Sequence, residues 1–441
     1  MTSLDGVRMN IGDVLKEIIL DFQARTLENS VPRRLRIDSV PGKAAVCLGV
    51  RRSGKSTFLF QIVQALYGRG IKPQNVLYVN FFDDRLHELT LYGPAPVLEA
   101  YFSLFPEKKG TETVYCFFDE IQMVKDWEPF VDRLLRTERC EVYLTGSSAR
   151  LLSREMATQM RGRSLSWELF PFSFAEFLDF KGIQVHPETG RNRLLALKAF
   201  EEYWQKGGFP EARNVADRVR VMIHQDYFRT MVYRDIVERH DAMHPQSVMD
   251  LAFRLVNNVA ASHSVNSLTG YLRALNHKVS KAFVGECLEW LEDAFFLFSV
   301  KIWDASLARQ NVNAKKVYCI DHAMVTSVCP GILVNSGHLL ENLIFLHLRR
   351  QTERIYYYRT QNGREVDFIW QDASGKRHLA QVCESMAAHP ETQRREVTAL
   401  TEAMQEMKLT KGIIVTRSES QELKTPSGRI TVMPAWKFLL S

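Results

Sequence analysis

The sequence predicts an α/β protein whose N-terminal part is built on a parallel β-sheet. Three observations lead to this prediction. Short apolar segments alternate with helical patterns as far as about residue 180, and a glycine-rich loop joins one such segment directly to a helix at residues 49–56. Helical patterns then dominate, and strand patterns return in the last third of the chain. This order indicates a sheet-based core followed by smaller domains.

The composition excludes several classes of protein. Of the 441 residues, 46% are hydrophobic and 24% are charged, which is typical of folded globular chains with about two to four domains. No apolar stretch reaches about 18 residues and no secretory signal is present, so we expect a cytoplasmic protein without a membrane partner. The net charge of +6 is mild and evenly spread. It permits nucleic-acid binding without requiring it.

The first predicted strand, Ala44–Leu48, leads into the pattern GxxxxGK[ST] at residues 49–56. Strand, glycine loop and helix are the context that a phosphate-binding P-loop requires. Lys55 is expected to reach the β- and γ-phosphates of ATP, and the Ser56 hydroxyl to hold Mg²⁺. The residues expected to bind the nucleotide are Gly49, Arg51, Arg52, Ser53, Gly54, Lys55, Ser56 and Thr57.

A pair of carboxylates supplies the second half of this predicted site. Residues 75–82 form a predicted strand, and a further apolar strand at 114–118 ends in Asp119 and Glu120. We expect Asp119 to join the Mg²⁺ shell and Glu120 to polarise the attacking water as the catalytic base. The pattern resembles the branch of nucleotide hydrolases that inserts a strand between the lysine loop and the acidic strand.

Two further features near the predicted site are open to more than one interpretation. A fourth strand ends in Thr145 and Ser147, whose hydroxyls could sense the γ-phosphate, although Gly-Ser-Ser is also ordinary turn chemistry. Arg161 and Arg163 precede a fifth strand at 165–170. Either arginine, Arg163 first, could reach a neighbouring subunit's γ-phosphate, and a solvated surface arginine is the alternative.

Several motifs in this order resemble one family. They are RRSGKST, FFDEIQ, LTGSSARLL, RGR and LFPFSFAEFL, followed more weakly by the Gly207-Gly208-Phe209-Pro210 segment. They resemble the prokaryotic AAA-type ATPases, related to the archaeal and signalling ATPases, that carry a C-terminal domain of unknown function. The resemblance implies a RecA/AAA-like P-loop NTPase core, then a winged helix-turn-helix, then an α/β nuclease-like domain.

Five segments follow from the motifs and this resemblance. We expect an N-terminal helical extension (1–32), a P-loop ATPase core (33–180), a helical subdomain (181–244), a winged-helix domain (245–330) and a restriction-endonuclease-like domain (331–441).

The predicted winged helix rests on the order of its elements. Helical patterns at 246–261, 267–275 and 281–293 precede strand patterns at 294–302 and 315–320. Its third helix exposes Glu286, Glu289 and Glu292, which oppose the approach of phosphates, so a packing or regulatory role is favoured over groove reading. The wing carries Arg309, Lys315 and Lys316, which could still touch a DNA backbone.

The last segment resembles the restriction-endonuclease-like fold, with Glu341 on a helix and Asp367 on a strand. The metal site of that fold needs a Glu-x-Lys on the next strand, where this chain has Gln381-Val-Cys383. Glu384 is one residue out of register and is expected on the other side of the strand. We therefore expect no nuclease activity, and a remnant that contacts DNA or other subunits.

Two hypotheses of function follow. The first is an ATPase that hydrolyses ATP at the interfaces of a homo-oligomer, expected to be a hexameric ring, to remodel or translocate DNA. The second is an ATP-dependent conformational switch in signalling or defence, without motor activity.

Overall fold

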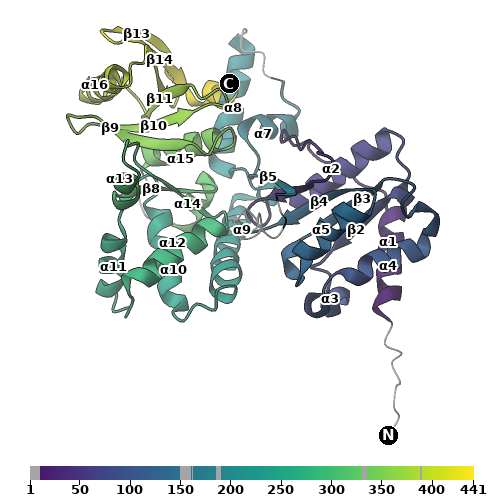
Figure 1. Cartoon of the computed structure of the whole chain (residues 1–441). Helices are drawn as coiled ribbons and strands as arrows, with labels where there is room; N and C mark the ends of the chain where they lie inside the picture. Colours follow the sequence, from purple (N-terminus) through teal and green to yellow (C-terminus); the bar gives the residue numbers. More distant parts are fainter. Residues whose placement is uncertain (1–9, 149–159, 161, 185–189, 330–334, 388–389) are drawn as a thin grey trace. The chain divides into compact units, whose positions relative to one another are not determined.

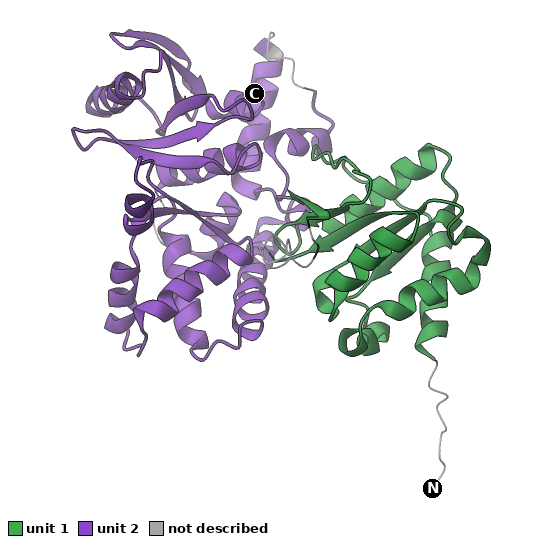
Figure 2. Ribbon diagram, viewed as in Figure 1, with its two compact units in different colours: residues 1–169 green, residues 170–441 purple. Residues whose placement is uncertain are grey.

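The computed structural model describes residues 10–148, 160, 162–184, 190–329, 335–387 and 390–441. They belong to two compact units, residues 1–169 and 170–441 (Figure 2). Arg161, one of the two candidate arginines, lies outside the described residues.

The first unit is built on a parallel five-stranded sheet, as the sequence predicts (Figure 1). Its strands are β1 (Ala44–Leu48), β2 (Val76–Asn80), β3 (Val114–Asp119), β4 (Cys140–Gly146) and β5 (Ser164–Glu168). Their order is β2-β3-β4-β1-β5. The strand inserted between the lysine loop and the acidic strand is therefore β4. The strand that separates the two motifs in the sequence, β2, lies at the edge of the sheet.

Helices pack against this sheet because its strands are apolar on both faces. They are α1 (Ile11–Ala24), α2 (Lys55–Gly68) and α5 (Trp127–Thr137), and α4 (Ala95–Leu104) packs on α1, while α3 (His87–Tyr92) is a short helix that precedes α4. In the core, the Phe117 and Tyr143 rings stack with centroids 4.8 Å apart. Helix α1 places Phe22 against Tyr78 of β2 in a second stack, with centroids 4.3 Å apart. The N-terminal helix is thereby anchored beside the acidic strand.

The second unit begins with helices, and a pair of glycines after one of them contacts an aspartate from a later segment. These helices are α7 (Phe174–Lys181), α8 (Gly190–Lys206), α9 (Asp217–Thr230) and the π-helical η7 (Met231–Glu238). Gly208 N donates a 2.6 Å hydrogen bond to Asp321 Oδ2. Gly207 has φ +75°, and a Cβ there would lie 2.4 Å from Asp321 Oδ1. A Cβ at Gly208 would lie 2.5 Å from Phe172 O, so both positions of this pair require glycine.

Three helices and a small antiparallel sheet follow, in the order that the sequence predicts for residues 246–320. The helices are α10 (Pro245–Asn257), α11 (Val265–Ala274) and α12 (Lys281–Asp293), and the sheet, ordered β6-β8-β7, contains β6 (Ser262–His263), β7 (Leu297–Val300) and β8 (Lys315–Cys319). The Ser280 hydroxyl caps α12 by accepting a hydrogen bond from Phe283 N. Two elements were not predicted: β6, and the short helix α13 (Leu307–Val312) between β7 and β8.

The C-terminal part is a mixed six-stranded sheet that follows α14 (His322–Val328) and α15 (Ser336–Arg349). Its strands are β9 (Ile355–Arg359), β10 (Glu365–Gln371), β11 (Arg377–Val382), β12 (Lys411–Thr416), β13 (Gln421–Thr425) and β14 (Gly428–Pro434), in the order β13-β14-β12-β11-β10-β9. Helix α16 (Pro390–Glu406) buries Leu400 and Met404 in the core against this sheet, and α17 (Ala435–Phe438) ends the fold.

Backbone hydrogen bonds join the small sheet to the six-stranded one. Trp303 N donates to Tyr357 O at 2.7 Å, and Tyr357 N donates to Lys301 O at 3.1 Å. The Asn342 side chain of α15 accepts from Cys319 N at 2.7 Å and donates to Cys319 O at 2.9 Å. The two sheets therefore share buried contacts within the second unit. In the part of the chain that the structure describes, none of the helices combines the length and the apolar surface needed to span a bilayer.

Candidate nucleotide-binding site

The loop between β1 and α2 has a backbone that only certain residues permit. Gly49 has φ +154°, and a Cβ there would lie 2.2 Å from Leu169 O. Gly54 has φ +96° and occupies the N-cap of α2. Arg52 also has positive φ, at 68°. The glycines thus let the loop turn tightly and deliver it to the N-terminus of a 14-residue helix, which favours anions.

Lys55 lies at the centre of this loop. Its side chain is buried, and Nζ donates to Gly49 O at 3.1 Å and to Val50 O at 3.2 Å. The Glu120 carboxylate oxygen Oε1 lies 3.7 Å from Nζ. The lysine loop and the acidic pair therefore lie side by side, at the carboxyl ends of β1 and β3.

The two carboxylates of the pair are held differently. Asp119 is fully buried; its Oδ2 accepts a 2.8 Å hydrogen bond from the Tyr78 hydroxyl, and its Oδ1 accepts one from the Thr145 hydroxyl. Glu120 has a left-handed backbone, φ 54°, and its N donates to Thr145 Oγ1 at 2.9 Å. Burial and the neighbouring Asp119 raise the pKa of Tyr78 far above its usual value, so its hydroxyl keeps its proton and remains a donor.

The Glu120 side chain is oriented by an amide. Gln122 Nε2 donates to Glu120 Oε2 at 2.5 Å and lies 3.5 Å from Ser147 Oγ. The Glu120 side chain is 19% exposed, so part of it can meet solvent. Ser147, at the end of β4, is buried beside this pair. The two hydroxyls selected from the sequence thus have different places: Thr145 contacts Asp119, and Ser147 contacts the amide that orients Glu120.

Ser53 and Ser56, also selected from the sequence, have different surroundings. Ser53 is fully buried, and its hydroxyl has no hydrogen-bond partner among the described residues. Ser56 lines a cavity of about 320 Å³ together with Tyr78, Asn80, Arg25 and Arg85.

Three further residues selected from the sequence belong to this same segment of the chain. Arg51 places its guanidinium 5.9 Å from the centre of the Phe82 ring. Arg52 and Thr57 are exposed.

These observations fit a magnesium nucleotide. A buried hydroxyl without a partner, an ammonium held only by carbonyls at hydrogen-bond distance, and a helix N-terminus are all suited to phosphate oxygens. The buried Asp119 carboxylate and the Ser56 hydroxyl are oxygen donors of the kind that Mg²⁺ prefers. The residues Ser53, Lys55, Ser56 and Asp119 could therefore hold the phosphates and the metal ion.

Arg163 lies far from the lysine loop of its own chain. Its carbonyl accepts a 2.8 Å hydrogen bond from Ala44 N, at the first residue of β1, whereas the loop follows the last residue of that strand. A five-residue strand separates the two by about 13 Å. Arg163 Nε lies 3.6 Å from Asp132 Oδ1, and the side chain is 36% exposed. Its backbone therefore lies at the opposite end of β1 from the lysine loop.

Two residues of this site escaped the sequence analysis. Tyr78 could not be selected because its contact with Asp119 depends on how β2 pairs with β3. Arg33 lies before β1, and its guanidinium donates to Ser53 O at 2.8 Å, which supports the lysine loop from outside. An arginine shortly before a glycine loop is a weak signal, because many surface arginines occupy such positions.

Comparisons with known proteins agree with this geometry. Residues 41–178 match a family described as an AAA domain. Residues 197–332 and 336–438 match two families described as domains of unknown function, DUF8612 and DUF4143.

Relatives extend the match over the whole chain. An uncharacterised protein of Methanocaldococcus jannaschii is 32% identical over 441 residues, covering 97% of this chain and 95% of the relative. One from Haemophilus influenzae is 28% identical over 326 residues, covering 74% of this chain and 78% of the relative. Among solved structures, the Aeropyrum pernix ORC1 protein in complex with DNA aligns with a TM-score of 0.29 and 13% identity, covering 72% of this chain and 91% of that chain. The family matches and the archaeal relative show that this chain belongs to the prokaryotic AAA-type ATPases that join an AAA domain to a C-terminal DUF4143 domain.

Proposed function

We propose that this protein hydrolyses ATP with Mg²⁺ at contacts between its own subunits, and uses the energy to remodel or translocate DNA. The observation that carries the proposal is the approach of Lys55 Nζ to Glu120 Oε1, 3.7 Å apart, beside a glycine loop and a helix N-terminus. An ammonium, oriented carboxylates and a helix N-terminus in one place are the groups that phosphoryl transfer to water requires.

Each residue has a role in this scheme. Lys55 exchanges its carbonyl partners for the β- and γ-phosphates, which are stronger acceptors for an ammonium. Ser56 and Asp119 hold the metal ion, which neutralises charge on the phosphates when it is bound. Glu120, fixed on one side by Gln122, accepts a hydrogen bond from the attacking water on its other side and orients it.

Self-assembly would complete the site. The backbone of Arg163 lies at the opposite end of β1 from the lysine loop and its side chain is partly exposed, so a second subunit could present it to the γ-phosphate, where a guanidinium stabilises developing charge. Asp132 pairs with Arg163 within the chain, and this pairing would be exchanged on assembly. We propose a homo-oligomeric ring, with six subunits as the expected number.

The DNA part of the proposal is supported by the three helices and small sheet at residues 245–319, the order of elements in a winged helix. One observation favours the second candidate, a nucleotide-driven switch. Helix α12 exposes Glu286 and Glu289, which repel a phosphate backbone.

The deciding experiment is an ATPase assay with single-stranded, duplex and junction DNA at two salt concentrations. A motor that acts on DNA should show strong stimulation by one of these DNAs, weakening as salt increases. Unchanged turnover with every DNA would favour the switch. No hydrolysis under any condition, with the purified protein folded, would remove the ATPase proposal itself.

A further inference from the structure

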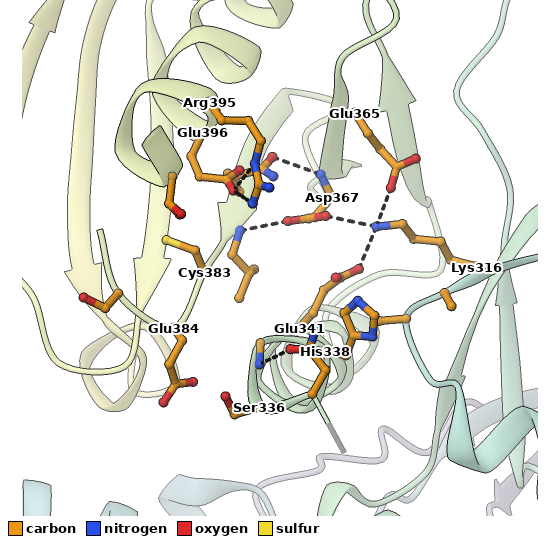
Figure 3. Close-up of a pocket in the computed structure, with 18 of the residues that line it drawn as sticks. Lys316, Ser336, His338, Glu341, Glu365, Asp367, Cys383, Glu384, Arg395 and Glu396 are labelled. Carbon is orange, nitrogen blue, oxygen red and sulfur yellow. Dashed lines mark hydrogen bonds and ion pairs between the residues drawn. The ribbon is translucent and has the colours of Figure 1, made fainter. Parts of the chain in front are cut away.

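A cavity of about 600 Å³ opens inside the second unit, between the small sheet and the six-stranded sheet (Figure 3). It lies where the nuclease-like fold would hold its metal ion, because Glu341 and Asp367 both line it. Glu365 and Lys316 line it as well. The carboxylates come from α15 and β10 of the C-terminal part, whereas the lysine comes from β8 of the preceding segment.

Lys316 reaches all three carboxylates at the same distance. Its Nζ lies 2.9 Å from Glu341 Oε1, 2.9 Å from Glu365 Oε1 and 2.9 Å from Asp367 Oδ1. The residue is only 3% exposed. A buried ammonium has three protons to donate, and three carboxylate oxygens can satisfy all of them. The dashed contacts in Figure 3 converge on this nitrogen.

Other donors occupy these carboxylates further. The Tyr318 hydroxyl donates to Glu341 Oε1 at 2.7 Å, and Val382 N donates to Asp367 Oδ2 at 2.9 Å. Gln381, which stands where the fold would carry a glutamate, accepts a hydrogen bond from Asp367 N at 3.2 Å and adds no charge. Within the described residues, no group of three or more histidine, cysteine or acidic side chains is arranged to hold a metal ion.

We propose that Lys316 is the resident cation of this carboxylate cluster, and that its ammonium takes the place in which a nuclease-type site binds a divalent metal. A metal ion needs oxygen lone pairs at about 2.1 Å for Mg²⁺. Here one oxygen of each carboxylate faces an ammonium, and a second positive charge at the same place would be repelled. The C-terminal part keeps the shape of a nuclease site, and the Lys316 ammonium of the same chain closes that site to the metal.

A different role for Lys316 makes the opposite prediction. In a working nuclease, a lysine beside the metal would help to activate water, and the carboxylates would bind metal with the lysine present. That arrangement requires carboxylate oxygens directed at a metal and the ammonium next to it. Lys316 instead lies between all three carboxylates, which is the place of the metal and not of its neighbour.

The test uses the full chain with Mn²⁺ as the probe, measured by titration calorimetry. The wild-type protein and a Lys315→Ala control, changed at the neighbouring position of β8, should bind no Mn²⁺ that depends on Asp367. Lys316→Ala and Lys316→Gln should bind Mn²⁺ at least tenfold more tightly, and a further Asp367→Asn substitution should abolish the gain. ATP is left out, so that the nucleotide site does not add a metal of its own.

Two kinds of result would overturn the proposal. One is Mn²⁺ binding by the wild-type protein that Asp367→Asn removes, or DNA cleavage by the wild-type protein that Lys316→Ala removes. The other is a folded Lys316 variant that binds no Mn²⁺. The wild-type measurements keep the proposal open to refutation even if both Lys316 variants fail to fold, and none of the results depends on ATP hydrolysis.

Discussion

Two buried lysines, Lys55 in the first unit and Lys316 in the second, show how the same side chain can serve opposite purposes. Both are almost inaccessible, with 5% and 3% of their surface exposed. Lys55 has two backbone carbonyls as hydrogen-bond partners and a single carboxylate at 3.7 Å. Lys316 contacts three carboxylates at 2.9 Å each. The first is incompletely neutralised, and the second is surrounded by an excess of negative charge.

The difference teaches that partners, rather than burial, decide whether a lysine can receive a ligand. Carbonyl oxygens hold an ammonium weakly enough that phosphate oxygens can replace them. Three carboxylates hold it strongly, and releasing the lysine would leave several buried charges uncompensated. The predictions below separate these two situations, beginning with the largest expected effect.

Glu120→Gln should lower ATP turnover by about 10²–10⁴-fold while ATP binding persists, because the amide cannot accept a proton from water. Single-turnover hydrolysis and nucleotide titration measure the two quantities separately. Glu99→Gln, an exposed position on α4, is the matched control and should behave as wild type. Turnover near the wild-type value would remove Glu120 from its proposed role.

Lys316→Ala should lower the free energy of unfolding of the second unit by about 3–5 kcal/mol, because it strands buried carboxylates. Urea denaturation of the full chain measures this. Nucleotide affinity should not change. If Lys316→Ala is as stable as Lys315→Ala, the buried carboxylates do not depend on Lys316, and the proposed contrast between Lys55 and Lys316 is wrong.

For Lys55→Ala we expect the converse pattern, in which ligand binding changes and stability does not. It should weaken ATP binding at least about 100-fold, equivalent to about 2.7 kcal/mol, and leave the unfolding midpoint close to that of wild type. Equilibrium binding of a fluorescent ATP analogue provides the readout, and Lys72→Ala, an exposed lysine of the same unit, serves as the control. Retained affinity would show that the carbonyl-held lysine is structural after all.

Tyr78→Phe should have a smaller effect, directed at the metal. It removes the hydroxyl that donates to Asp119 Oδ2 at 2.8 Å. We expect the Mg²⁺ concentration for half-maximal ATPase activity to rise by about tenfold, because a hydrogen bond to a charged group contributes about 1.5–3 kcal/mol. Tyr115→Phe on β3 is the control. An unchanged Mg²⁺ requirement, with reduced stability alone, would make Tyr78 merely a core residue.

The last prediction concerns the pH dependence of stability. Burial, and then the nearby Asp367, raises the pKa of Glu341 from 4.5 to about 8. The folded protein therefore binds more protons than the unfolded chain between these values, so this group's contribution to stability is complete below pH 4.5 and is lost as pH rises towards 8. Glu341→Gln cannot titrate and should flatten the decline in unfolding midpoint from pH 5 to pH 8. Parallel curves for the two proteins would contradict the raised pKa.

The nucleotide site was largely predictable because its signals are local. The strand, the glycine loop and the helix around Lys55 are contiguous in the sequence, and parallel strands bring their carboxyl ends to one edge, which places Glu120 nearby. The role of Arg163 in a second subunit stays a prediction. The contact of Tyr78 with Asp119 was not predictable, because it depends on strand register and on the packing of α1.

The carboxylate cluster of the tail was only half predictable. Glu341 and Asp367 were selected from the sequence, but Lys316 was assigned to a wing that could touch a DNA backbone, and this was wrong because the residue is buried. Its contacts span 25 and 51 residues and join β8 to α15 and β10, which no local pattern encodes. Glu384 was expected on the far side of its strand, yet it lines the same cavity as Asp367. Strand β11 ends at Val382, so the alternation of side chains no longer applies there.

The stack of Phe22 on Tyr78 has a practical consequence for anyone who expresses this protein. Through this stack, helix α1 contacts the tyrosine whose hydroxyl donates a hydrogen bond to Asp119. A minimal fragment that begins at β1 would lack α1. We expect it to keep an intact lysine loop, but to hold less firmly the Asp119 carboxylate that is proposed to bind the metal ion. Such a fragment would look like a poor enzyme for a reason that lies outside the lysine loop and the acidic pair.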